Sequence, residues 1–435
     1  MSTVVSYDEA DHDARRARQW LAGQARDPGV SRAELIAVGT AMSALAAATD
    51  TRDPVTPATG TREPVTPAAG PVGVAPGIIK PLDPAQLTPR DGNAEMRWEA
   101  MSGQGYVVPN DRFFVRNHTH TPRIDADTWR LRLYGDGLRD TPTRDAPIVF
   151  GYADLRALPA VELPALVECA GNGRHFFASQ QDTPASGVQW RLGGVGVARW
   201  RGVPLATVLR HAGLTPDAVD VMPEGLDPPY VSGGVDLGRV RRPLPIGKAL
   251  DDVLLAYEMN GAPLPPDHGF PVRVVVPGWI GISSIKWVGA IEVSTVALFS
   301  PWNTSLYRMF GPGRPVDGGP VDTQSVKSAF ELPWDARLAA GVETTLTGRS
   351  WSGAGPIDRV EVDTGDGWQP ATLVGADRGG PWQRWSTRWC PPTAGRWTLR
   401  ARAVDVTGRG QPDRAPGNDL GYLFDGVVRH PVTAV

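Results

Sequence analysis

Residues 166–174 read LVECAGNGR, where a short apolar run ends at Cys169 and a glycine-rich turn carries Arg174. An apolar run followed by glycines is typical of a buried strand that ends in a turn. Backbone N–H groups can crowd around a ligand at such a junction, and a nearby guanidinium favours thiolate over thiol. Because a lone cysteine is more often a small buried hydrophobe, the rest of the chain must decide between a core residue and a reactive or metal-binding thiolate.

The composition limits the classes of protein to consider. A chain of 435 residues is too long for one ordinary core and predicts two domains with extra segments. With 44 basic and 47 acidic residues, the formal charge of −3 gives no sign of a nucleic-acid partner or a polybasic membrane patch. The second cysteine, Cys390, lies far downstream, so the pair gives no disulfide framework.

The N-terminal apolar run, residues 35–48, has two interpretations. It is too short to cross a bilayer, so we expect no transmembrane segment. Ser31 and Glu34 form a capping box for a helix, whereas the run ending in Ala46–Ala48 also outlines an export signal. No twin arginine directly precedes the run. The helix, and with it a cytoplasmic location, is favoured over export by a degenerate twin-arginine-type signal.

A duplicated tract separates this segment from the rest of the chain. Residues 51–60, TRDPVTPATG, are nearly repeated at 61–70, TREPVTPAAG, and a proline- and threonine-rich repeat of this kind predicts a semi-extended linker. We therefore predict an N-terminal segment of residues 1–80, a first domain of 81–310 and a second of 320–435. The glycine- and proline-rich stretch 311–320 between the two domains is a predicted hinge.

Local sequence patterns predict different secondary structure in the two domains. Residues 129–133 alternate as a half-exposed strand should, and 205–213 have helical spacing that ends in a glycine. Further on, 359–368 predict a hairpin and 397–403 a strand with one apolar and one basic face. The expected fold is α+β, with a mixed catalytic domain followed by an all-β sandwich of immunoglobulin type that lacks the usual cysteine pair.

Two cations interrupt apolar runs: Arg273 in FPVRVVVP, residues 270–277, and Lys286 in IKWV, residues 285–288. A charge in a buried strand costs several kcal/mol unless it is paired. Each cation therefore predicts either a solvent-facing edge or an anionic partner. Since the turn Asp267–Gly269 places a histidine just before them, the group suggests a site for a bound anion such as phosphate.

A similar pattern lies upstream in FFVRNH, residues 113–118, where Arg116 and His118 share one face if the segment is extended. An ordinary amphipathic strand would give the same pattern. Downstream, Tyr307 places an aromatic hydroxyl in a loop beyond the last predicted strand of the domain.

These motifs together resemble the sulfite oxidase family of molybdopterin-dependent enzymes, in the form whose catalytic domain precedes an immunoglobulin-like dimerisation domain. The resemblance spans residues 98–435 and is strongest at CAGN 169–172, LLAYEMNG 254–261 and PPDHGFPVR 265–273. It implies a homodimer that binds the molybdenum cofactor.

The resemblance also implies roles for individual residues. Cys169 would be the protein thiolate on molybdenum, with the pterin dithiolene supplying two more sulfurs. The positions that match the family's cofactor-binding residues are Phe114, Arg116, Asn117, His118, Asp227, His268, Arg273, Ser284, Ile285 and Lys286. The two cations inside apolar runs would thereby gain an anionic partner.

For the substrate, the resemblance implies a cationic pocket formed by Arg116, Arg174, Trp190 and Tyr307, in which sulfite becomes sulfate by oxygen-atom transfer. Where the family's second domain supplies a further arginine, this chain has Asp425, and the nearest cation is Arg429. The substrate is therefore less firmly implied than the cofactor.

No haem signature is visible, because a CxxCH motif is absent from the sequence. Electrons would then leave to a separate acceptor: a cytochrome, dioxygen or a quinone-linked carrier. Two rival functions remain open, namely a relative that reduces nitrate or a sulfoxide, and a non-catalytic binding or assembly module. Tyr307 and Arg174 favour sulfite, and Cys169 with the anion-binding set argues against the module.

Overall fold

The computed structural model describes residues 77–435 except 233, 316–317 and 376–377. The predicted helix or signal at 35–48 and the repeats at 51–70 lie outside the described residues. Within the part that is described, no helix combines the length and apolarity needed to span a bilayer.

Two five-stranded sheets form the first half of the described chain. The first has the order β10-β7-β14-β3-β4, and β14 pairs with β3 in parallel. Its strands are β3 (Arg130–Tyr134), β4 (Ile148–Gly151), β7 (Asp220–Gly225), β10 (Leu244–Pro245) and β14 (Val288–Ser294). The second has the order β12-β11-β6-β5, with β13 also paired to β11. Its strands are β5 (Val161–Glu168), β6 (Val195–Pro204), β11 (Leu254–Met259), β12 (Ala262–Pro263) and β13 (Arg273–Val275).

The helices among the described residues are short. They are α3 (Tyr152–Ala157), α4 (His175–Gln181), α5 (Leu205–His211), α6 (Ile246–Asp251) and α7 (Pro301–Thr304), with 3-10 turns η1 (Trp98–Met101), η2 (Pro266–His268) and η3 (Gly281–Ser283). Helix α5 confirms the helix predicted from 205, and the chain leaves it through Gly213 at φ +84°. The fold is thus mostly β with a few helices, less helical than the predicted α+β class suggests.

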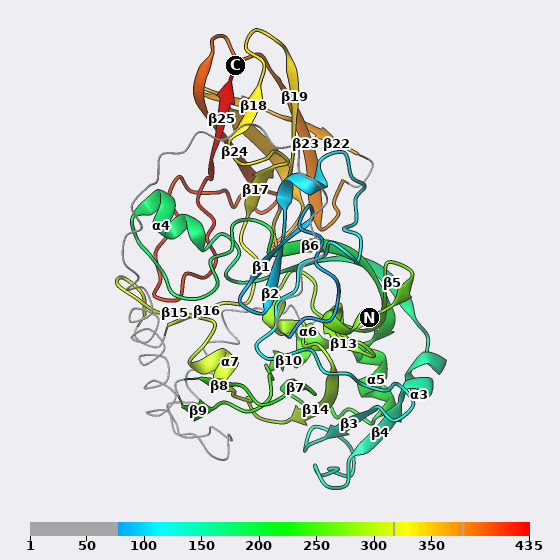
Figure 1. The fold of residues 1–435 in the computed structure, drawn as a ribbon. Coiled ribbons are helices and arrows are strands. Elements are labelled where there is room, and N and C mark those ends of the chain that lie inside the picture. The colour runs from blue at the N-terminus through cyan, green and yellow to red at the C-terminus, as the bar shows by residue number, and fades with distance from the viewer. Residues whose placement is uncertain (1–76, 233, 316–317, 376–377) are drawn as a thin grey trace.

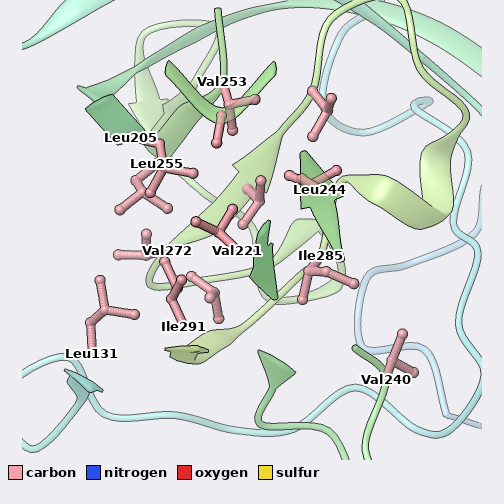
Figure 2. Packing of buried hydrophobic residues seen from close by; sticks show 14 of the residues in the cluster. Leu131, Leu205, Val221, Val240, Leu244, Val253, Leu255, Val272, Ile285 and Ile291 are labelled. Atoms are coloured by element: carbon pink, nitrogen blue, oxygen red, sulfur yellow. The ribbon is translucent and has the colours of Figure 1, made fainter. Parts of the chain in front are cut away.

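The second sheet is buried on both faces, as strand β11 illustrates. Leu255 and Tyr257 pack into the core shared with the first sheet, whereas Leu254 and Ala256 pack into a second core on the opposite side. This alternation follows from the two-residue period of a strand. Figure 2 shows the first core, and two of the residues labelled there, Val240 and Ile285, also line the cavity described below.

The C-terminal half consists of two further sheets (Figure 1). One, ordered β17-β19-β23-β22, contains β17 (Lys327–Phe330), β19 (Thr344–Trp351), β22 (Thr372–Val374) and β23 (Trp382–Trp389). The other, ordered β18-β25-β24-β20-β21, contains β18 (Ala336–Leu338), β20 (Ile357–Asp363), β21 (Trp368–Pro370), β24 (Gly395–Asp405) and β25 (Arg429–Ala434). The antiparallel pair β20–β21 confirms the predicted hairpin, and β24 contains the strand predicted at 397–403.

Short elements complete the described chain. The hairpin β1 (Leu87–Arg90) and β2 (Asn93–Met96) precedes the first sheet, and β8 (Val231–Ser232) pairs with β9 (Val235–Asp236). Strands β15 (Arg308–Met309) and β16 (Gly319–Pro320) pair with each other, so the predicted hinge at 311–320 falls largely within their connecting loop.

A long connection, residues 406–428, joins β24 to β25 and runs back from the C-terminal half toward α4 (Figure 1). The Phe424 ring anchors it there, with ring centroids 5.5 Å from Phe176 and 5.1 Å from Phe177. The C-terminal half therefore contributes side chains to the surroundings of the Cys169 turn.

Candidate active site

The turn predicted after residue 168 is present and closely held. Strand β5 ends at Glu168, Cys169 N–H donates to the Gly194 carbonyl at 2.8 Å, and Asn172 N–H donates to the Cys169 carbonyl at 2.8 Å. A Cβ atom at Gly171 would lie 2.5 Å from the Arg174 guanidinium. Glycine at 171 thus allows Arg174 to fold back over the turn.

A cavity of about 730 Å³, part of it open to solvent, lies beside Cys169. It brings together twelve of the residues that the sequence singled out, although they are spread over almost two hundred positions. They are Phe114, Arg116, Asn117, His118, Cys169, Asp227, His268, Arg273, Ser284, Ile285, Lys286 and Tyr307. The cavity lining combines the cations Arg273 and Lys286 with the cysteine.

Arg273 and Lys286 both face this cavity from positions where carbonyl oxygens, rather than carboxylates, accept their hydrogen bonds. Arg273 donates to the His268 carbonyl at 3.1 Å and the Ser284 carbonyl at 3.0 Å. Lys286 Nζ donates to the Asp267 carbonyl at 2.9 Å and to the side-chain oxygen of Asn117. Within the described ranges, neither cation has an ion-pair partner within 4.0 Å, so their charges are not neutralised by the protein.

The environment of these cations lowers their pKa values. Burial lowers the pKa of Arg273 to about 9 and holds that of Lys286 well below its usual value. Lys80 lies in the same group, 3.4 Å from His268 Nε2, and burial lowers its pKa to about 8. Since burial and the neighbouring cations also lower the pKa of His268, its ring is neutral near pH 7. A bound anion would relieve this accumulation of positive charge.

A hydrogen-bond network fixes polar residues that line the cavity. The buried Asp267 carboxylate accepts from the backbone N–H of Ile79 and Lys80 and, at 2.5 Å, from the Thr121 hydroxyl. Thr121 in turn accepts from the Asn117 side-chain amide at 3.0 Å. Through these bonds the segment at 79–80 is attached to the folded domain.

A second cavity, of about 1040 Å³ and also partly open, adjoins the first on the other side of Cys169. Four residues line both: Arg116, His118, Cys169 and Tyr307. Arg174, Tyr230, Leu420 and Tyr422 are found on the second alone. Its cations and phenols suit a compact anion bound next to the cysteine.

Tyr307 lies at the junction of the two cavities. Its hydroxyl is 3.3 Å from His118 Nε2, and its backbone has φ +57°, an uncommon conformation for a bulky residue. Burial raises the pKa of Tyr307, and burial together with Arg116 and Lys286 lowers that of His118 well below its usual value. The phenol is therefore protonated and the imidazole neutral near pH 7, and the direction of the hydrogen bond between them is set by which ring nitrogen of His118 carries its hydrogen.

The two arginines are held differently. Arg174 is buried and donates from Nε to the Leu420 carbonyl at 3.0 Å and from an Nη atom to the Val188 carbonyl at 2.9 Å. Arg116 is only partly buried and faces both cavities. Burial alone would lower its pKa, but nearby Tyr307 and Cys169 raise it, and the net shift is upward. Both guanidinium groups remain charged.

Three positions that the family resemblance singled out lie outside both cavities. Trp190 lines neither cavity; it is fully buried behind Phe114, with ring centroids 6.2 Å apart, and its indole N–H has no partner among the described residues. Asp425 is also outside both cavities, and Arg429 is exposed on β25. A second-domain arginine is therefore not found in the described part of either cavity.

Sequence reasoning missed three residues near the site. Lys80 belonged to the predicted linker segment, yet its side chain donates to the Phe113 carbonyl at 2.5 Å. The Arg242 guanidinium lies 5.8 Å from the Tyr307 ring centroid, and the Tyr422 ring stacks on the same tyrosine with centroids 5.0 Å apart. No local pattern distinguishes them, although Tyr422 directly precedes the segment compared with the family's second domain.

The donor set fits a pterin-held metal better than a metal held by protein alone. The part of the chain that is described contains no group of three His, Cys, Asp or Glu side chains able to hold a metal ion. A metal at Cys169 would therefore need most of its ligands from elsewhere, which a dithiolene would supply, and the cations at 273 and 286 would meet the cofactor's phosphate.

Comparison with known proteins supports this reading. Residues 118–302 match the model of the oxidoreductase molybdopterin binding domain. Sulfite oxidase of Gallus gallus is 37% identical over 344 residues, covering 74% of this chain and 71% of that protein. Mitochondrial sulfite oxidase of Homo sapiens is 36% identical over 348 residues, covering 74% of this chain, which spans 60% of the human protein's length.

The chain is also similar to two proteins that are named for other activities. The NADH nitrate reductase 1 of Oryza sativa subsp. japonica is 30% identical over 340 residues, covering 73% of this chain and 36% of that protein. Among solved structures, the sulfane dehydrogenase SoxCD from Paracoccus pantotrophus superposes with a TM-score of 0.66 at 28% identity, covering 79% of this chain and 84% of the other. On this identity and coverage, the chain belongs to the sulfite oxidase family of molybdopterin-dependent oxidoreductases.

Proposed function

We propose that this protein oxidises sulfite to sulfate with a molybdenum cofactor and passes the electrons to a separate acceptor. The observation that carries the proposal is the convergence of Cys169, Arg116, Arg174 and Tyr307 on one cavity. The family relationship supports the same activity, since sulfite oxidases are among its most similar members.

The cofactor would be held by residues from several elements. Cys169 would be the protein ligand of molybdenum, Arg273 and Lys286 would neutralise the phosphate, and His268 and Ser284 would line the pterin. Phe114, Asn117, Asp227 and Ile285 would complete the walls. When bound, the cofactor supplies oxygen-atom transfer to sulfur and takes up the electrons released.

Arg116 and Arg174 would bind the sulfite anion next to Cys169. Both are charged and both border the second cavity, where the surrounding low-dielectric protein strengthens their attraction for an oxyanion. The carbonyl oxygens of Leu420 and Val188 hold Arg174 in place, so this cation is oriented before the substrate arrives. Orientation in advance lowers the cost of binding.

Tyr307 and His118 would manage protons at the bound anion. Oxidation of sulfite with an oxygen derived from water releases two protons with two electrons. The Tyr307 hydroxyl can donate a hydrogen bond to the anion and, when His118 carries its hydrogen on Nε2, can accept one from that nitrogen at 3.3 Å, so the two side chains form a path for a proton. Trp190 would act indirectly, by supporting Phe114.

The C-terminal half would be an immunoglobulin-type sandwich that forms a homodimer. Its two facing sheets and its hydrophobic core between them are consistent with this architecture. We further propose domain limits of 81–310 and 320–435, and a monomer in solution at working concentrations, measured by light scattering, would contradict the dimer.

The test is metal analysis coupled to turnover. Purified protein should contain one molybdenum and one pterin per chain and should oxidise sulfite with ferricyanide as acceptor. Cys169→Ser should lose both the molybdenum-centred redox signal and sulfite oxidation, whereas Cys390→Ser, at the exposed second cysteine, should keep both. Retention of both properties by Cys169→Ser would overturn the assignment.

The same preparation separates the rival functions. Molybdenum-loaded protein that ignores sulfite but reduces nitrate or dimethyl sulfoxide with a reduced viologen dye would make it a reductase of the same family. Protein without molybdenum and pterin, isolated from cells that load other molybdoenzymes, would favour a binding or assembly module. Sulfite turnover dependent on Cys169 would exclude both alternatives as the main function.

A further inference from the structure

The connection between β24 and β25 is fastened to the Cys169 turn at two points. Leu423 N–H donates to the Ala170 carbonyl at 2.8 Å, and the Leu420 carbonyl accepts from Arg174 Nε at 3.0 Å. The segment between Leu420 and Leu423 is therefore held at a fixed position beside the site. It contains Tyr422.

The backbone of Tyr422 is also clamped from within the connection. Its N–H donates to Asn418 Oδ1 at 2.9 Å, and the Asn418 side-chain amide donates to its carbonyl at 2.9 Å. Both neighbours have left-handed backbone conformations, Gly421 at φ +58° and Leu423 at φ +51°. An orientation specified this closely is unusual for a residue in a long loop.

The Tyr422 ring packs against both the Tyr307 ring and the Arg174 guanidinium. It lies parallel to the Tyr307 ring, with centroids 5.0 Å apart and an interplanar angle of 13°. The Arg174 guanidinium lies 5.5 Å from the Tyr422 centroid, and Arg242 lies 5.8 Å from that of Tyr307. Through these two contacts Tyr422 helps to position both an anion-binding arginine and the active-site tyrosine.

The Tyr422 hydroxyl has capacity for one more hydrogen bond. The oxygen accepts from the Tyr307 backbone N–H at 3.4 Å, but the structure gives the phenolic hydrogen no acceptor among the described residues. The side chain lines the second cavity, together with Arg116 and Arg174. Burial raises the pKa of Tyr422, so the hydroxyl stays protonated near pH 7 and can donate.

We propose that Tyr422 is a further substrate-binding residue, whose hydroxyl donates a hydrogen bond to an oxyanion of sulfur while its ring holds Arg174 and Tyr307 in place. The second domain would then supply a neutral donor to the anion, although Asp425 occupies the position where the family resemblance implies an arginine. This inference rests on the proposed function for the identity of its substrate.

The experiment compares Tyr422→Phe, which keeps the ring stack and removes only the hydroxyl, with Tyr422→Leu, which removes both. Steady-state kinetics with sulfite and ferricyanide give KM and kcat, and isothermal calorimetry gives the affinity for sulfate in the same holoenzyme. Tyr152→Phe is the matched control, since that half-buried tyrosine packs against Trp129, away from both cavities.

We expect Tyr422→Phe to raise KM for sulfite and Kd for sulfate by roughly 10-fold, with molybdenum content and kcat nearly unchanged, because a hydrogen bond to a charged group is lost. Tyr422→Leu should lower kcat/KM further, since Arg174 and Tyr307 lose their common support. Wild-type values of both KM and Kd for Tyr422→Phe would overturn the proposal.

The two proposals fail in different ways. If the wild-type enzyme does not oxidise sulfite, the proposed function is wrong, and calorimetry with sulfate still tests Tyr422 as an anion donor. If the wild type oxidises sulfite and Tyr422→Phe behaves like Tyr152→Phe in both measurements, the proposed function stands and Tyr422 has only a packing role.

Discussion

The cations on the two sides of the Cys169 turn have opposite surroundings. Between the two halves of the molecule, Lys327 pairs with Glu168 at 2.7 Å, with side chains 3% and 1% exposed. On the cofactor side, Arg273 and Lys286 have only neutral oxygens as acceptors within the described residues. A buried cation that is paired with a carboxylate stabilises the fold, whereas unpaired cations that converge on a cavity indicate a binding site for an anion.

Glu168 shows how fully the paired side is satisfied. Besides Lys327, its carboxylate accepts from the Asn172 side-chain amide at 2.9 Å and the Trp351 indole at 3.1 Å. Lys327 also donates to the Asn172 carbonyl at 3.0 Å. The second half of the molecule thereby supports the strand end and the turn that carry Cys169.

The largest effect is expected when this pair is broken. Lys327→Met leaves the Glu168 carboxylate buried without its cation and should lower the free energy of unfolding by about 3–5 kcal/mol. Adding Glu168→Gln should recover part of the loss, since glutamine removes the charge and keeps an acceptor. Denaturant titration followed by tryptophan fluorescence measures both; a loss below about 1 kcal/mol in the single variant would contradict the comparison.

On the unpaired side, pH should reveal the cost of burying a cation. The pKa of Lys80 is lowered from 10.5 to about 8, chiefly by burial, so between these values the unfolded chain binds more protons than the folded one. The free energy of unfolding of cofactor-free protein should therefore rise with pH across this window, by on the order of 3 kcal/mol in total. Below pH 8 the folded protein bears the full cost of burying the Lys80 ammonium.

Comparison with Lys80→Met isolates this contribution from other groups. The difference in unfolding free energy between wild type and variant, measured at pH 7.5 and pH 10, should change in favour of the wild type at the higher pH. An equal pH dependence in the two proteins would mean that the Lys80 ammonium is hydrated and titrates normally.

An anion should relieve the same cost at neutral pH. Inorganic phosphate at about 100 times its Kd should stabilise cofactor-free protein by roughly 2–3 kcal/mol, because it binds only the folded state. Lys286→Met should weaken this effect, whereas Lys248→Met should not, since Lys248 already pairs with Asp252 at 2.6 Å outside both cavities. Thermal melts against phosphate concentration measure it, and equal phosphate effects in the two variants would contradict the anion site.

The parts of the site that could be predicted from the sequence are residues that depart from the pattern of their own segment. Arg273 and Lys286 interrupt apolar strands, and Cys169 stands where a strand meets a glycine turn, so each departs from its local pattern. For each cation the sequence left two alternatives, a solvent-exposed strand edge or an anionic partner. Arg273 is 4% exposed, which rules out the exposed edge for this residue. The helix at 205 and the hairpin after 359 were predicted because their periodicity and turn residues are strictly local.

The remaining residues could not be predicted, because their roles depend on distant contacts. Lys80 sits in a segment with no strand or helix pattern and is drawn into the site by Asp267, 187 positions away. Tyr422 lies in an irregular connection, and its partner Tyr307 is 115 positions earlier. Such pairs depend on how whole elements pack, which short-range spacing does not encode.

The smallest effect is expected for a charged pair that is exposed. Arg388 and Glu343 lie 3.4 Å apart on the C-terminal half, with side chains 77% and 61% exposed, so water already solvates both charges. Arg388→Ala should change the free energy of unfolding by less than about 0.5 kcal/mol, and less still in high salt. The denaturant titration used for Lys327→Met measures it under identical conditions. A loss comparable with that of Lys327→Met would mean that pairing alone, rather than burial, determines the energetic weight of a charge in this protein.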